Sequence, residues 1–243
     1  MPEGPSLVIL KEKIEEFTGR TVQEASGLRD LDYDRITGHK ILDIRTWGKH
    51  LLLCFSGFTI RIHLMMFGSY RINERKKTNP AIRLTFANSE LNFYSTNVKV
   101  LDGDVNDHYD WSADIMNTKW NPKAAKAKLK KIPEAYICDA LLEQDIFSGV
   151  GNIIKNEALY RAKVHPESLV GKIPAACLTQ LIDEAHDYTL QFLHDKKKGT
   201  LTKNWEVYTK KKCRRCDLPI VKEYTGKGKR RTFFCANCQK LYE

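Results

Sequence analysis

The sequence lacks the features of a membrane or secreted protein. Its longest unbroken apolar run, residues 51–55, has five residues, whereas a transmembrane helix needs about 20. No apolar stretch of the kind found in a secretory signal follows the N-terminus, so we expect a cytoplasmic protein without a membrane partner. Internal repeats and low-complexity tracts are also missing. With 243 residues, 42% of them hydrophobic, the chain can bury a core without disulfide bonds.

Net positive charge is absent from most of the chain. Residues 1–195 contain 25 Lys and Arg against 26 Asp and Glu, whereas residues 196–243 contain 15 against 4. The whole excess of +10 therefore comes from the C-terminal segment, which suggests a polyanionic partner, most often nucleic acid. A disordered basic tail is the alternative. This segment is rich in cysteine and aromatic residues, however, and disordered tails are poor in aromatics.

The hydrophobic pattern predicts an α+β fold. A helix should follow Gly4, because Pro5 suits its first turn and apolar residues recur every three or four positions until Gly19. Short apolar runs joined by tight turns such as Ser56-Gly57 then favour an antiparallel sandwich or barrel. The expected strands are residues 40–46, 50–55, 58–64, 82–87 and 91–94, and the helices that follow lie near residues 122–130, 134–145, 152–162 and 174–195.

Four cysteines near the C-terminus are spaced like metal ligands. Cys213 and Cys216 form one Cys-x2-Cys pair, Cys235 and Cys238 form a second, and 18 residues separate the pairs. This spacing predicts a four-thiolate zinc site, which is structural because four protein ligands fill the coordination sphere. Two disulfides, or a coincidence, are the alternatives. The other three cysteines, Cys54, Cys138 and Cys177, lie in apolar surroundings and are expected in the core.

A basic segment connects the two cysteine pairs. Residues 227–231 read Lys-Gly-Lys-Arg-Arg, which would place cations on a metal-bound hairpin where they can meet phosphates. By itself this feature predicts only a zinc ribbon that binds nucleic acid.

Three motifs in order are much more specific. The chain begins Met1-Pro2-Glu3-Gly4-Pro5, residues 149–152 read Gly-Val-Gly-Asn, and the zinc ribbon comes last. Together they resemble the formamidopyrimidine-DNA glycosylase / endonuclease VIII family over essentially the whole chain. The resemblance implies an N-terminal helix with an antiparallel β-sandwich at residues 1–118, a helix–two-turns–helix domain at 119–205 and a zinc finger at 206–243.

The resemblance also implies a chemistry for the first residues. Removal of Met1 would expose the secondary amine of Pro2, and an α-amino group has a reference pKa near 8, so much of it is neutral and nucleophilic. In the family this amine attacks the sugar, expels a damaged base, forms a Schiff base and cuts the strand by β,δ-elimination, while Glu3 moves protons at the sugar ring. The alternative is a frayed terminus without function.

Further residues match the DNA-binding positions of the family. Lys49, after the Trp47-Gly48 turn, corresponds to a catalytic lysine that contacts a backbone phosphate. Asn152 begins a helix after a glycine-rich turn and would bind phosphate, although Asn is also a good helix cap. Arg230 corresponds to the finger arginine that grips phosphates beside the flipped nucleotide, with its neighbour Arg231 as the alternative.

Residues 63–68 lie where the family keeps side chains that fill the gap left by a flipped base. Apolar wedges can replace the stacking that base flipping removes. This assignment concerns Met65, Met66 and Phe67. Membership of the hydrophobic core is the alternative for all three.

Two features bear on the substrate. Gly4 is typical of endonuclease VIII, and the stretch 199–213 lacks the longer insert of the purine-specific branch, so oxidised pyrimidines in double-stranded DNA are the expected substrates. One departure is Ser6, where most members have Glu. The alternatives are a purine-preferring glycosylase of the same family and a non-catalytic zinc-ribbon protein. We further expect a monomer of bacterial type, associated with the nucleoid and without a small-molecule cofactor.

Overall fold

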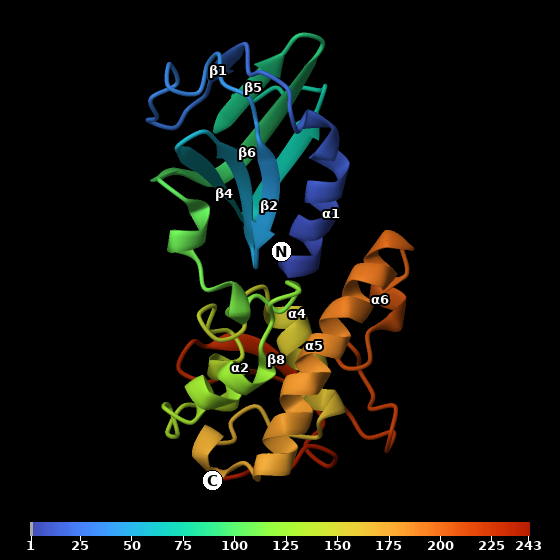
Figure 1. Ribbon diagram of the computed structural model, residues 1–243. Helices are drawn as coiled ribbons and strands as arrows, with labels where there is room; N and C mark the ends of the chain where they lie inside the picture. Colours follow the sequence, from blue (N-terminus) through green and yellow to red (C-terminus); the bar gives the residue numbers. More distant parts are fainter. Residues whose placement is uncertain (1) are drawn as a thin grey trace. The chain divides into compact units, whose positions relative to one another are not determined.

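An antiparallel sheet occupies the first part of the chain and helices occupy most of the second (Figure 1). The structure is a computed structural model that describes residues 2–243. It divides into two compact units, residues 1–109 and 110–243, which we describe one at a time. The three-part division at residues 118/119 and 205/206 stays a prediction.

The N-terminal unit contains one six-stranded sheet in the order β1-β5-β6-β4-β3-β2, with every neighbouring pair antiparallel. The Ser56-Gly57 turn joins β3 to β4 as expected, and Gly57 has the positive φ of +78° that glycine tolerates. The strands are β1 Glu24–Ser26, β2 Asp43–Trp47, β3 His50–Phe55, β4 Phe58–Ile72, β5 Ile82–Phe86 and β6 Ser89–Asp102.

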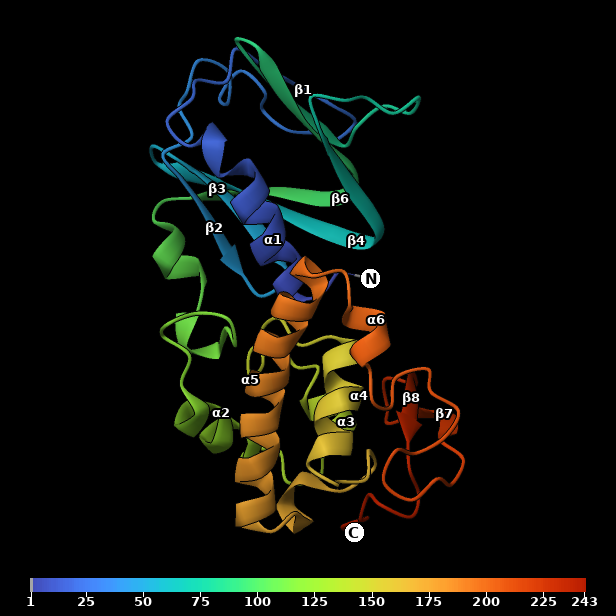
Figure 2. The ribbon, with the colours of Figure 1, turned by 90° about the vertical axis from the view of Figure 1, so that its right-hand side faces the viewer.

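Helix α1, Gly4–Ile14, covers this sheet and continues into a short 3-10 helix, Glu15–Phe17. Its apolar residues at positions 7, 10, 14 and 17 are fully buried, and it packs against β2 and β3 (Figure 2). The predicted helix is therefore confirmed. The spacing of three or four residues between buried positions places them on one face, which packs against the sheet.

Strands β4 and β6 are far longer than the sequence predicted. Their pairing shifts between Leu64 and Ser69, where residues 65–68 stand opposite the single residue Ser95. Such an irregularity bends a strand without ending it. The alternation of apolar and other residues stops at Leu64, because Met65, Met66 and Phe67 follow it directly, which is why the sequence pattern indicated only residues 58–64.

The C-terminal unit is built around α4, Asn152–Arg161, and α5, Ala175–Lys197. These two helices pack together, and α2, Pro122–Leu129, also lies against α5. All three match predicted helices. The helix predicted at 134–145 is wrong: α3 spans only Ile137–Ala140. The side chain of Gln144 bonds to the main chain of Leu142, Gly149 and Val150, which stabilises a series of turns instead.

The last part of this unit is a short hairpin. Strands β7, Val221–Thr225, and β8, Arg230–Phe234, pair with each other, and β8 lies beside α4. One further helix, α6, Leu201–Asn204, was not predicted. Among residues 2–243, no helix combines the length and the apolar character that crossing a membrane requires.

Ile14 is fully buried between α1 and the sheet, whereas its neighbour Lys13 is exposed. We expect Ile14→Ala to lower the free energy of unfolding of the N-terminal unit by about 2–4 kcal/mol, because the cavity adds to the lost transfer energy. Urea unfolding followed by circular dichroism measures this, with Lys13→Ala as the control. Equal unfolding midpoints for the two variants would contradict this packing.

Candidate functional site

The first residues are held firmly by α1. Glu3 is fully buried at the N-cap position of the helix, where its side chain makes no capping hydrogen bond and its carbonyl accepts the Ser6 N–H at 2.8 Å. Pro2 is half-buried. The hydroxyl of Ser6 is buried and has no hydrogen-bond partner among residues 2–243. A fully buried side chain is not expected at a frayed end, so Glu3 is not frayed, and its catalytic role stays a prediction.

Lys49 lies in the tight turn between β2 and β3, where Gly48 has a φ of +52°. Beside it, the aromatic rings of Trp47, His50 and Tyr109 pack with centroids 4.9 to 5.8 Å apart. The Tyr109 hydroxyl lies 3.3 Å from His50 Nδ1. These rings form a rigid support for the turn that carries the lysine.

The pKa values of His50 and of His63, whose ring centroid lies 5.2 Å from that of His50, are both lowered. Burial, together with the charges of Arg61, His63 and Lys49, lowers the pKa of His50 to about 3. Burial and the charges of Lys49 and Arg61 also lower the pKa of His63. The charges of Lys49 and Arg61 therefore act on both rings.

Residues 65–67 project from the sheet at the irregular register. Met65, Met66 and Phe67 are 49%, 57% and 84% exposed. A side chain on Gly68 would collide with the main chain of Met65 at 2.8 Å, so only glycine closes this loop. The alternative that these residues belong to the core is wrong. A row of exposed large apolar side chains is a candidate contact surface.

In the C-terminal unit, polar residues of α4 bind the hairpin. The Asn152 amide donates to the Arg231 carbonyl at 2.8 Å, and the Asn156 side-chain oxygen accepts the Phe233 N–H at 2.6 Å. Lys155 is fully buried and donates to the Thr232 hydroxyl at 2.8 Å. The helix cap is Gly151, without a side-chain bond, so the capping role considered for Asn152 is wrong.

Glu157 binds the segment that lies between α6 and the first cysteine pair. Its buried carboxylate accepts the main-chain N–H groups of Glu206, Val207 and Tyr208 at 2.9 to 3.1 Å. Burial, the dominant effect, raises the pKa of Glu157, while these three hydrogen bonds oppose the shift. The stretch that follows α6 is therefore fixed to the centre of the unit.

The four C-terminal cysteines come together. Their sulfur atoms all lie within 4.8 Å of one another. Cys213 and Cys238 are 3.9 Å apart and Cys216 and Cys235 are 3.5 Å apart, too far for disulfides. Thiolates around one tetrahedral ion with metal–sulfur bonds of about 2.3 Å lie about 3.8 Å apart. The four cysteines can therefore bind one metal ion.

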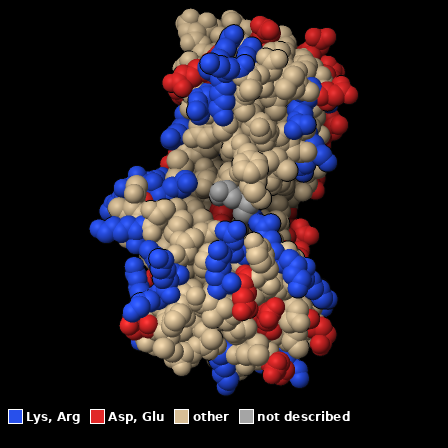
Figure 3. Space-filling view, turned by 180° about the vertical axis from the view of Figure 1, so that it is seen from behind, with Lys and Arg blue, Asp and Glu red and all other residues tan. Residues whose placement is uncertain are grey.

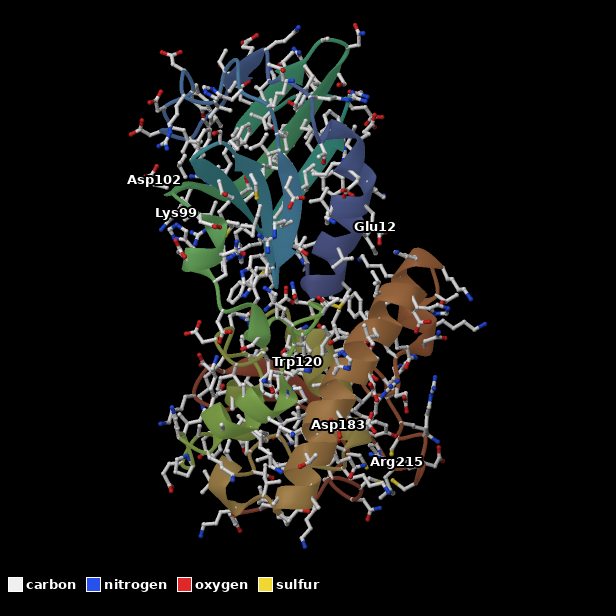
Figure 4. All side chains as sticks on the ribbon, in the orientation of Figure 1. Glu12, Lys99, Asp102, Trp120, Asp183 and Arg215 are labelled. Atoms are coloured by element: carbon white, nitrogen blue, oxygen red, sulfur yellow. The ribbon has the colours of Figure 1, made fainter. Side chains whose placement is uncertain are left out.

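Neighbouring side chains hold this cysteine cluster in place. The Tyr160 hydroxyl lies 3.2 Å from the Cys213 sulfur. The guanidinium of Arg215, a residue labelled in Figure 4, lies 3.8 Å from the Tyr160 ring centroid and donates to the Tyr160 carbonyl at 2.8 Å. The Tyr160 ring, which contacts the Cys213 sulfur, therefore belongs to α4, the same helix that binds the hairpin. Of the remaining cysteines, Cys54 and Cys138 are buried as predicted and Cys177 is half-buried.

Arg230 and Arg231 occupy different positions. Arg230 is half-buried at the start of β8, whereas Arg231 is exposed and lies 6.0 Å from the ring of Tyr224 on β7. Lysine and arginine side chains stand out in several groups on the surface of the C-terminal unit (Figure 3). The positive charge found in the sequence is therefore presented to solvent.

Lys155, Asn156 and Glu157 were not among the predicted site residues. The signal that could have found them is weak: positions 152, 155 and 156 share one helix face, but a polar face of this kind usually faces solvent. Asp139 and Glu167, which contact the turn of the hairpin, carried no such signal.

Two family descriptions match this chain. The formamidopyrimidine-DNA glycosylase N-terminal domain matches residues 1–98, and the H2TH domain of the same enzymes matches residues 112–204. The chain belongs to the family of formamidopyrimidine-DNA glycosylases and endonuclease VIII.

Individual relatives carry endonuclease VIII names. Endonuclease 8-like 3 of Xenopus laevis is 31% identical over 86% of this chain and 36% of its own length. Probable endonuclease 8 2 of Streptomyces coelicolor is 26% identical over 98% of this chain and 94% of its own. The chain thus spans about a third of the length of the endonuclease 8-like 3 relatives.

Solved structures of similar fold include that of Lactococcus lactis formamidopyrimidine-DNA glycosylase bound to DNA with an abasic site. It superposes on this chain with a TM-score of 0.88. The two share 23% identity over 98% of this chain and 99% of the other. The likeness confirms the predicted α+β fold.

Because the pKa of His50 is about 3 in the folded protein and about 6.5 in an unfolded chain, the unfolded state binds its proton first as the pH falls. Folding stability should therefore decline below about pH 6.5. Replacing the ring by phenylalanine removes this titration. Between pH 7.5 and 5.0 the wild type should lose about 2 kcal/mol more than His50→Phe, measured by urea unfolding. Identical pH dependence would show that His50 titrates normally.

Proposed function

We propose that the protein is a DNA glycosylase with abasic-site lyase activity that acts on oxidised bases in double-stranded DNA. The observation that carries the proposal is the buried Glu3 carboxylate at the start of α1, directly beside Pro2, in a chain of this family. Burying a carboxylate costs free energy of folding. Its position next to a potential amine nucleophile is consistent with a catalytic role that would account for this cost.

In the proposed reaction, the Pro2 amine, freed by removal of Met1, attacks the C1′ carbon of the damaged nucleotide. The bond from C1′ to the base breaks, and the base leaves with its electron pair and takes up a proton. The nitrogen then loses its proton, and the C1′–O4′ bond breaks as O4′ takes up a proton, which opens the sugar ring and leaves an iminium. This iminium acidifies the C2′ hydrogen, whose loss expels the 3′ phosphate, and loss of the C4′ hydrogen then expels the 5′ phosphate. Glu3 exchanges protons at the sugar ring oxygen during these steps.

DNA would be held by charge and by an apolar wedge. Lys49, Asn152 and Arg230 are proposed to contact backbone phosphates, which fix the register of the strand without reading its sequence. Met65, Met66 and Phe67 are proposed to fill the gap left by the flipped base, and their exposure supports this role.

A preference for oxidised pyrimidines is part of the proposal. The stretch between α6 and Cys213 is short, and Glu157 binds three of its N–H groups. No long insert is thus available in this stretch to fold over a purine.

The preference is tested with duplexes that contain thymine glycol, 8-oxoguanine or no lesion. We expect strand cleavage to be fastest on thymine glycol and absent without a lesion. Faster cleavage of 8-oxoguanine would favour the purine-preferring alternative. No cleavage of any duplex, with tight DNA binding retained, would favour the non-catalytic alternative.

Glu3→Gln is the matched test of the carboxylate. We expect base excision to fall by at least about 100-fold, because proton transfer at the sugar is lost while the shape is kept. Exposed Glu12, on the same helix (Figure 4), provides the control Glu12→Gln, with unchanged activity. Equal rates for both variants would remove Glu3 from the mechanism.

The metal is proposed to be zinc, with a structural role. Four thiolates suit zinc and leave no position open for substrate. Metal analysis should find one zinc per chain. A strong chelator should unfold the hairpin and abolish DNA binding, while the unfolding midpoint of the N-terminal unit stays unchanged. Full DNA binding by metal-free protein would contradict the structural role.

A further inference from the structure

The turn of the finger hairpin is held by carboxylates of the helical region. This turn, residues 226–229, is called the finger turn below. The N–H of Lys227 donates to Asp139 Oδ2 at 2.6 Å, and the N–H of Gly228 donates to Asp139 Oδ1 at 3.2 Å. The N–H of Gly226 donates to Glu167 Oε1 at 3.2 Å. Three consecutive main-chain donors therefore end on two acidic side chains.

The finger turn rests directly on the Asp139 carboxylate. A Cβ atom on Gly226 would lie 2.5 to 2.7 Å from the three carboxyl atoms, and one on Gly228 would lie 3.0 Å from Oδ1. Gly226 also has a φ of +70°, which side chains other than glycine rarely adopt. The two glycines thus permit a close approach between the turn and this one aspartate.

This contact decides which groups of the turn can bind a phosphate. Glycine-rich turns often bind anions through their N–H groups, but here these groups already bond to Asp139 and Glu167. Among the cationic side chains at the turn, those of Lys227 and Lys229 are exposed and that of Arg230 is half-buried. Arg230 directly follows the turn, and its Cγ lies 3.7 Å from where a Gly228 side chain would begin. The first part of the Arg230 side chain therefore lies against the turn.

We propose that Asp139 is a positioning residue: it fixes the finger turn so that Arg230 meets a backbone phosphate of DNA, with Glu167 supporting the same turn. The inference rests on the proposed function, in which Arg230 binds phosphate. A carboxylate that accepts two successive N–H bonds forms strong, directional contacts. Asp139 takes no part in the chemical steps.

A double-mutant cycle tests the proposal. Binding is measured by fluorescence anisotropy on a duplex with a tetrahydrofuran abasic analogue, at several salt concentrations, for Asp139→Ala, Arg230→Ala and the double variant. Each single variant should weaken binding about tenfold and reduce the salt slope by about one phosphate contact. The double variant should bind like Arg230→Ala alone. Single-turnover cleavage at saturating DNA should be unchanged for Asp139→Ala.

The control is Glu134→Ala, which removes an exposed acidic residue from the preceding turn and should leave binding unchanged. Zinc content shows whether the finger stays folded. If Asp139→Ala loses zinc, the same cycle is made with Asp139→Asn, which keeps the shape of the side chain.

Two results would overturn the inference about Asp139 alone: unchanged affinity on its replacement, or losses that add in the double variant. Unchanged affinity and salt slope for Arg230→Ala would instead show that the phosphate role of Arg230 is wrong, and the inference about Asp139 would fall with it.

Discussion

The attachment of the finger to α4 is the constraint on which the C-terminal unit depends. One face of this helix binds the hairpin through Asn152, Lys155 and Asn156, and binds the preceding segment through Glu157. The ring of Tyr160, on the same helix, reaches a cysteine of the metal cluster. Helix α4 thus carries Asn152 and binds the strand that begins with Arg230, the two residues of this unit that the proposal assigns to DNA.

Hydrogen bonds between α4 and the hairpin position the hairpin more precisely than an apolar contact would. A buried polar group that loses its partner costs about 1–3 kcal/mol, so the partners must meet in one register. Hydrophobic packing tolerates sliding, whereas a row of side chain to main chain bonds does not. The carboxylates of Asp139 and Glu167 bind the main chain of the finger turn in the same way, at the other end of the hairpin. A well-fixed hairpin backbone places the Arg230 guanidinium precisely, and the proposed phosphate contact depends on that position.

Local patterns made much of this predictable. The 3–4 residue spacing before Gly19 identified α1, and the paired cysteines identified a cluster that the folded chain brings together. Long-range pairing was not predictable. Nothing near Asp139 in the sequence indicates that it meets a turn almost 90 residues later. Strand β4 was predicted only to Leu64, because the register irregularity breaks the alternation on which such a prediction depends. The helix predicted at 134–145 was wrong because Gln144 competes for main-chain groups.

The central claim is that the amine of Pro2 performs the chemistry. Its most direct test is borohydride trapping on an abasic-site duplex, with protein verified by mass to lack Met1 beside protein that retains it. The account predicts a covalent protein–DNA adduct only for the Met1-free form, with similar DNA affinity for both forms. Equal adduct from the two forms would contradict it, because a blocked Pro2 cannot form an iminium.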